Sequence, residues 1–120
     1  HHSLQSSTLN DFLSNLSFTK RNDYRMKSII QTEKQCYITG DEYNLHEHHV
    51  FNGSNRKKSE KYGLKIWLRA DWHNMEKYSI HMDAELDRRI KAEVQQIAMD
   101  HYGWKVEDFI RMFGKNYIMA

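Results

Sequence analysis

Five of the chain's eight histidines lie between residues 46 and 81, and these side chains are the ones most able to do chemistry. Three stand in the segment His46-Glu47-His48-His49, and His73 and His81 follow. Neutral imidazole is a preferred ligand of transition metals, and its ordinary pKa of roughly 6.5 suits proton transfer near neutral pH. Single surface histidines are often merely solvated, but five together favour a metal site that also carries a base.

The composition indicates one small globular domain. The chain has 120 residues, of which 39% are hydrophobic and 28% charged, and its formal net charge is +2. It is long enough for one modest core, and its weak positive charge permits a nucleic-acid partner without requiring one. Because His1-His2-Ser3 looks like the end of a purification tag, residues 1–3 carry no functional weight.

The sequence predicts a cytoplasmic protein that does not enter a membrane. It has no apolar run long enough to cross a bilayer and no recognisable signal peptide. Its one cysteine, Cys36, excludes an internal disulfide framework and agrees with a reducing compartment.

Periodicity and turn residues predict an α+β fold. The patterns indicate helices over residues 8–16, 55–62 and 106–113, a further helix from Asp83 to the residue before Gly103, and a strand over 64–68. Residues 36–38 and 45–51 flank a turn rich in Gly, Asp and Asn and predict a β-hairpin. Ser54 is expected to cap the helix over 55–62, and Gly63 to end it. Asp71 is expected to cap another helix, with His73 and Asn74 in its first turn.

The two C-terminal helices supply the clearest candidate core. One stripe of the longer helix is apolar, and His101 lies on it, so we interpret His101 as structural. The stripe consists of Leu86, Ile90, Val94, Ile97, Ala98 and His101. On the last helix Phe109, Ile110 and Phe113 are expected to face inward. The aromatic residues interpreted as packing rather than base-stacking are Trp67, Trp104, Tyr62 and Tyr117.

Taken in order, these motifs resemble HNH nucleases of the ββα-metal (His-Me finger) class, particularly phage-type proteins similar to the recombination-enhancement, RecA-dependent nucleases. The likeness spans about residues 36–117, and it is carried by the segments 45–51, 53–64, 67–68, 73–74, 80–81 and 112–117. It implies a small ββα-metal core, a β-hairpin plus a helix, with helices packed at the N- and C-terminal sides. Residues 1–120 would then be a single domain, with an N-terminal extension (4–33), an HNH-like core (34–82) and C-terminal helices (83–120).

The resemblance also implies roles. It maps the general base to His49 and metal ligation to His48 and His73, with His81 as third ligand and His46 as the alternative. One divalent ion, Mg or Mn for activity, would bind the scissile phosphate, and cleavage would leave a 5′-phosphate. Histidine-rich ligation also suits Zn or Ni. Strand geometry leaves one point open, because His48 and His49 share a face only if the strand ends or bulges at His49. In a regular strand His46 and His48 would be the chelating pair, and His49 would turn inward.

A basic block follows the histidine segment. It consists of Arg56, Lys57, Lys58 and Lys61, and it would neutralise DNA phosphates in a largely sequence-independent way.

The chain departs from the resembling family at two features. Where the family has the two Cys-x-x-Cys pairs of a zinc knuckle, this chain has Cys36 with Thr39 and Arg69 with Trp72, so that zinc cannot be held. Packing must then hold the hairpin, with Trp72 filling the space that the zinc would have occupied. Gly63 stands where the family has its middle asparagine, and Asn55 is the candidate substitute.

The leading hypothesis is a metal-dependent DNA endonuclease of phage recombination or repair, acting in a bacterial host and working with a RecA-type recombinase. One alternative is a nucleic-acid-binding module that has lost catalysis. Another is a zinc-stabilised interaction domain whose closed site is made by His46, His48, His73 and His81. The strand form of the DNA, the oligomeric state and the role of Asn74 stay open.

Overall fold

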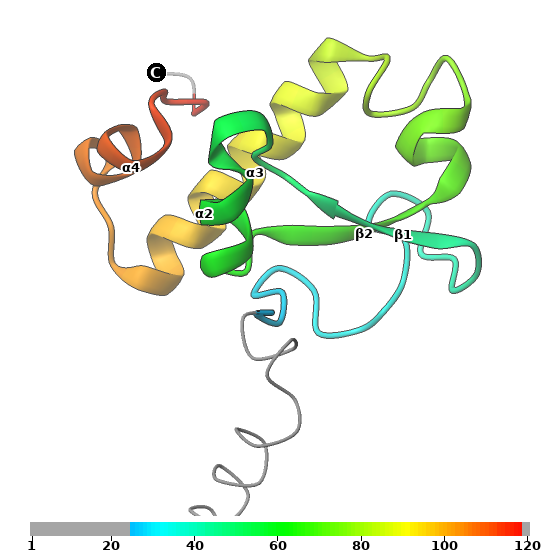
Figure 1. Ribbon diagram of the computed structural model, residues 1–120, viewed down its shortest axis with the longest axis horizontal. Coiled ribbons are helices and arrows are strands. Elements are labelled where there is room, and N and C mark those ends of the chain that lie inside the picture. Colours follow the sequence, from blue (N-terminus) through cyan, green and yellow to red (C-terminus); the bar gives the residue numbers. More distant parts are fainter. Residues whose placement is uncertain (1–24, 119–120) are drawn as a thin grey trace, which may run out of the picture.

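An antiparallel pair of strands lies at the centre of the computed structural model, which describes residues 25–118 (Figure 1). β1 covers Leu45–His49 and β2 covers Lys65–Arg69. The strands are in register from the Leu45–Arg69 pair to the His49–Lys65 pair. Helices α2, α3 and α4 complete the fold, which is therefore the expected α+β arrangement of a β-hairpin plus helices. The tag residues, the predicted helix over residues 8–16 and most of the N-terminal extension lie outside the described residues.

The strand partner predicted for residues 45–51 is wrong. The sequence favoured a hairpin with residues 36–38, but β1 pairs with β2 instead. Residues 36–40 close a tight turn, in which the Gly40 amide donates to the Cys36 carbonyl at 2.8 Å. The Tyr37 amide then donates to the Trp67 carbonyl at 2.8 Å, so this segment runs along the outer edge of β2. In Lys65–Arg69 the alternate residues Ile66 and Leu68 are buried on the inward face, which makes that segment the better partner for β1.

The connection between the strands contains a single 3-10 turn, Gly53–Asn55, followed by α2, Arg56–Lys61. The predicted helix is thus present but shorter, and Ser54 does not cap it because it lies inside the preceding turn. Gly63 then reverses the chain with a φ of 71°. A Cβ atom at Gly63 would lie 2.5 Å from the Lys27 carbonyl oxygen, so only glycine fits there.

Asp71 does not begin a regular helix. The segment Asp71–Met75 is one wide helical turn, and the Asp71 carboxylate bonds to Arg69 rather than capping a backbone amide. The long helix α3, Ala84–Tyr102, starts as predicted, with Asp83 accepting from the amides of Glu85 and Leu86 at 3.1 and 3.0 Å. The predicted helix α4 covers Val106–Phe113.

The core lies between the inward face of the strand pair, α3 and α4. Ile66 and Leu68 alternate inward along β2, and the ring of Phe51 contacts those of Phe109 and Phe113 at centroid distances of 5.4 and 5.0 Å. The other buried apolar side chains are Cys36, Val50, Leu64, Ile80, Ile90, Val94 and Ala98.

Three residues expected in this core lie outside it. His101 is exposed, Ile110 is 39% exposed, and Ile97 is only partly buried and does not pack against the core cluster. Neighbouring residues of a helix point about 100° apart, so the inward positions Phe109 and Phe113 turn Ile110 away. Between residues 25 and 118, no helix has the length and apolar character needed to cross a membrane.

Candidate metal centre

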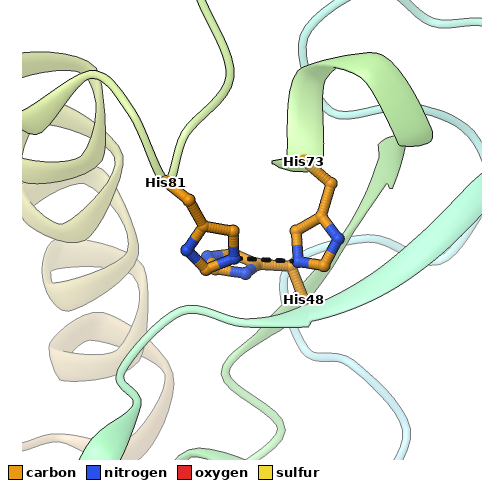
Figure 2. Close-up of side chains that lie close together, drawn as sticks. All are labelled: His48, His73 and His81. Carbon is orange, nitrogen blue, oxygen red and sulfur yellow. Dashed lines mark hydrogen bonds between the residues drawn. The ribbon is translucent and has the colours of Figure 1, made fainter. Parts of the chain in front are cut away.

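Three histidines from three different segments converge on one point (Figure 2). His48 comes from β1, His73 from the turn after β2, and His81 from the loop before α3. One ligand atom from each ring lies within 4.8 Å of the others, and His73 Nε2 stands 3.2 Å from His81 Nε2. Two imidazole nitrogens that share a tetrahedral ion at 2.0–2.1 Å are about 3.3 Å apart, so this spacing fits a bound metal.

Hydrogen bonds hold the segments that carry His73 and His81. The Asp71 carboxylate accepts from Arg69 Nε at 2.7 Å and from the Tyr78 hydroxyl at 2.7 Å, which fixes both ends of the loop after β2. The amide of buried Ile80 donates to the Trp72 carbonyl at 2.7 Å. These bonds position the neighbouring residues His73 and His81 before any ion binds.

His48 is the most informative of the three side chains. It is 3% exposed, and its Nε2 atom has no hydrogen-bond partner among the described residues. Burial, together with the neighbouring His73 and His81, lowers the pKa of His48 to about 3. Burial and the rings of His81 and His46 likewise lower the pKa of His73 to about 4. Both imidazoles are therefore neutral at neutral pH, as metal ligands must be, and an ion would satisfy the orphaned nitrogen.

His46 lies behind His73 rather than in the converging set. It shares the face of β1 with His48, as a regular strand requires, and its Nδ1 is 3.0 Å from His73 Nδ1. A histidine that ligates through Nε2 usually bonds its other ring nitrogen to a neighbouring group, which orients the ring. The geometry therefore groups His81, not His46, with His48 and His73.

His49 lies on the opposite face of β1. β1 is paired without a bulge and ends at His49, so the regular strand is the alternative that is observed. His49 lies on the face of β1 away from the core and does not turn inward as that alternative expected. His49 Nε2 is 2.7 Å from Glu60 Oε1. Burial opposes ionisation of Glu60, but hydrogen bonds from His49, the Met26 amide and Lys65 outweigh it and lower the pKa of Glu60 to about 2. Because this carboxylate can only accept, His49 Nε2 carries the proton and Nδ1 of the neutral ring carries the lone pair.

A buried lysine completes the group around His49. Lys65 is 3% exposed, and its ammonium lies 3.3 Å from Glu47 and 3.2 Å from Glu60. Oxygen and nitrogen atoms of Glu47, His49 and Glu60 are close enough to hold an ion, but Lys65 already supplies the positive charge there. The three-histidine group is therefore the better metal site. The spacing of Glu47 and His49 in one strand could have indicated this second group, whereas nothing in the sequence pointed to Glu60.

The basic block lies beside His49. A cavity of about 800 Å³ is lined by His49, Glu60 and three cations of the block, together with Met26 and Gly53; the cations are Arg56, Lys57 and Lys61. Lys58 is not among them, because its ammonium donates to the Met112 carbonyl.

The other residues singled out in the sequence do not join the histidine cluster. Asn55 does not reach the histidines, because its amide nitrogen donates to the Phe113 carbonyl at 3.0 Å. Asn74 is exposed. Trp72 packs against the core and lies against Tyr78, with ring centroids 4.5 Å apart, and Cys36 is buried. Packing thus fills this region of the described chain.

Comparisons of the chain with models of protein families, with curated proteins and with solved structures found no match. Its function is therefore inferred from the side chains themselves and their surroundings.

Proposed function

We propose that this chain is a metal-dependent endonuclease that hydrolyses phosphodiester bonds of DNA, as its resemblance to HNH nucleases implies. One observation carries the proposal. Three imidazoles, those of His48, His73 and His81, converge on one side of β1, while the next residue, His49, is held by a carboxylate on the other side. A cation site adjacent to an oriented base is what phosphodiester hydrolysis requires.

His49 would act as the general base. Its Nδ1 takes a proton from a water molecule, whose oxygen attacks phosphorus while the opposite P–O bond breaks, and solvent protonates the leaving oxygen. Glu60 accepts from Nε2 at 2.7 Å, keeps the ring in the reactive tautomer and stabilises the imidazolium that forms. A divalent ion held by His48, His73 and His81 would supply Lewis-acid stabilisation of the charge on the phosphate and on the leaving oxygen.

At the outer edge of β1, one phosphate can contact both the metal site and His49. Successive Cα atoms of a strand are about 3.8 Å apart, so His48 and His49 are close although they face opposite sides. Within residues 25–118, β1 pairs only with β2, which leaves its other edge without a strand partner. A phosphodiester crossing that edge would contact the metal site from one side and His49 from the other.

The cations beside His49 fit the flanking phosphates. Arg56, Lys57 and Lys61 line the same cavity as His49, so they can hold the backbone near the reacting group. Binding of this kind weakens steeply as salt rises, because each neutralised phosphate releases counterions.

The finer expectations stay predictions. They are Mg or Mn as the activating ion with Zn or Ni also binding, a RecA-type recombinase as partner, and a phage protein acting in the bacterial cytoplasm.

A zinc-stabilised structural domain is the second candidate, and it is favoured by His48 Nε2, which is buried and has no hydrogen-bond partner within residues 25–118. Structural zinc is almost always held by four protein ligands. Here His46 bonds to His73 instead of joining the set, and His81 is exposed, so a fourth position is left for water or phosphate. That arrangement favours a catalytic site.

The test is cleavage of single-stranded and supercoiled DNA with Mg²⁺, Mn²⁺ or a chelator. We expect cutting that requires metal and that falls about 10²- to 10⁴-fold in His49→Ala, the usual contribution of a general base. The matched control is His101→Ala, since His101 is exposed and lies outside the cluster. Undiminished cutting by His49→Ala, with its fold verified by circular dichroism, would contradict the proposal. Wild-type protein that binds DNA without cutting would indicate the binding module, and chelator-induced unfolding would indicate the structural zinc domain.

A further inference from the structure

A second cavity lies on the same face of the strand pair as His49, and the mechanism above does not use it. Its volume is about 500 Å³, which is within the usual range of small-ligand pockets. Its walls are the segment 25–34 and the outward-facing side chains of the strands, among them Glu47, Lys65 and Trp67. It therefore lies over the outward face of the strands rather than in the core.

The lining combines an aromatic ring with excess positive charge. Trp67 is half-buried, and the Lys34 ammonium stands 4.6 Å from its ring centroid. Four cations line the cavity, Arg25, Lys27, Lys34 and Lys65, against the single carboxylate of Glu47. Glu47 pairs with Arg25 at 2.8 Å and with Lys65 at 3.3 Å, whereas Lys27 and Lys34 form no ion pair within the described chain. Such a lining complements a ligand that joins a flat ring to negative charge.

The backbone at this wall is held in place before any ligand arrives. The Trp67 amide donates to Gln31 Oε1 at 2.8 Å, and its carbonyl accepts from the Tyr37 amide at 2.8 Å. The Ser28 hydroxyl donates to the Lys65 carbonyl at 2.6 Å. Because both sides of the Trp67 peptide are bonded, the indole is presented from a fixed position, which reduces the entropy lost on stacking.

The cavity adjoins the group that holds the base. Lys65 contacts Glu47, which lines this cavity, and also Glu60, which bonds to His49. Met26 lines both this cavity and the one that contains His49 and the basic block. A DNA strand with one phosphate at His49 would therefore place a neighbouring nucleotide here.

We propose that this cavity binds an unpaired nucleobase adjacent to the scissile phosphate, stacked on Trp67, with Lys27 and Lys34 on the flanking backbone. This replaces the packing role expected for Trp67 from the sequence, because Trp67 lines the cavity and is not among the residues packed against the core. The proposal rests on the proposed nuclease function and names its substrate as single-stranded DNA. A base inside a duplex is stacked and paired, so it cannot enter without being extruded. Aromatic side chains accept any base face, so we expect stacking here to be largely independent of sequence.

The test is fluorescence anisotropy with a labelled single-stranded oligonucleotide and with a duplex of the same sequence, both in chelator so that neither is cut. Trp67→Leu keeps apolar bulk but removes the π face, and we expect it to weaken single-strand binding about 5- to 100-fold. Trp67→Tyr, which keeps a π face, should stay within a few-fold of wild type, and duplex binding should change less than about twofold in either variant.

Lys34→Ala is the second variant, because Lys34 is exposed and its removal should not disturb folding. We expect it to weaken single-strand binding about threefold or more. Its matched control is Lys115→Ala, since Lys115 likewise lies over an aromatic ring, 5.3 Å from the centroid of Tyr117, outside this cavity.

Equal losses for single strand and duplex, no loss in Trp67→Leu, or a loss in Lys115→Ala matching that in Lys34→Ala would overturn the proposal. The readout is separate from cleavage. Trp67-dependent binding without metal-dependent cutting would support the cavity and refute the nuclease, whereas cutting without Trp67-dependent binding would refute the cavity alone.

Discussion

The Glu60 carboxylate contacts His49, buried Lys65 and a backbone amide, so changing Glu60 to glutamine should have a large and pH-dependent effect on the free energy of unfolding. Its carboxylate accepts from His49 at 2.7 Å and from the Met26 amide at 2.8 Å, and it lies 3.2 Å from Lys65. In Glu60→Gln the buried Lys65 ammonium would keep only Glu47 as a charged partner. Removing one partner of a buried charge is strongly destabilising.

The stability lost in Glu60→Gln can be estimated from the lowered pKa of Glu60. Moving a carboxyl pKa from 4.5 to about 2 corresponds to about 3 kcal/mol of stability. Glu60 is 23% exposed, so screening by water reduces the expected loss in Glu60→Gln to about 2 kcal/mol. Because the folded-state pKa is depressed, this stabilisation is fully present above pH 4.5 and is lost as the pH falls toward 2. The difference between wild type and variant should therefore be largest at pH 6–7 and shrink below pH 4.5.

Urea unfolding followed by circular dichroism at several pH values between 7 and 3 measures this difference directly. Glu33→Gln is the control, since Glu33 is exposed and forms no ion pair within residues 25–118; it should change stability by less than about 0.5 kcal/mol. A difference for Glu60→Gln that stays constant from pH 7 to 3, or one no larger than the control's, would show that the Glu60 carboxylate does not stabilise the fold in this way.

Three further predictions concern the metal and the fold. Zn²⁺ at 100 times its dissociation constant should raise the free energy of unfolding by about 2.7 kcal/mol, and thermal melts should show the gain in His101→Ala but not in His81→Ala. Gly63→Ala should lose about 2–4 kcal/mol in urea unfolding, because the residue has a positive φ and its Cβ would meet the Lys27 carbonyl; a loss under 1 kcal/mol would contradict this. Phe51→Ala should lose about 3–5 kcal/mol in the same assay, because its ring is 1% exposed and packed between aromatic neighbours, and a loss typical of surface changes would contradict it.

The sequence predicted the elements better than their pairing. The long helix after Asp83 was found from strong periodicity, its cap and a terminal glycine, all of which are local signals. The partner of β1 was missed, because the turn-rich segment 39–44 suggested a local hairpin whereas the true partner follows α2. Pairing depends on which distant segment offers a matching apolar face, and local patterns do not encode that.

In the candidate site too, the sequence did not show which residues distant in the chain come into contact. His48, His73 and His81 were grouped in advance by resemblance, and the structure brings those three rings together. Whether the strand would bulge at His49 could not be predicted from the sequence. One extra residue in a strand turns the side chains that follow it to the opposite face, and the local pattern does not show whether that residue is present. The role of Glu60 was not predicted either, because it depends on how α2 folds back over β1.

The most direct test of the metal centre is anomalous diffraction from crystals of the protein loaded with Zn²⁺, recorded at the zinc absorption edge. We expect a single strong peak bounded by Nε2 of His48, His73 and His81, with His46 bonded to His73 and outside the ligand set. A peak at Glu47, His49 and Glu60, a peak that includes His46 as a ligand, or no peak between the three rings would contradict it.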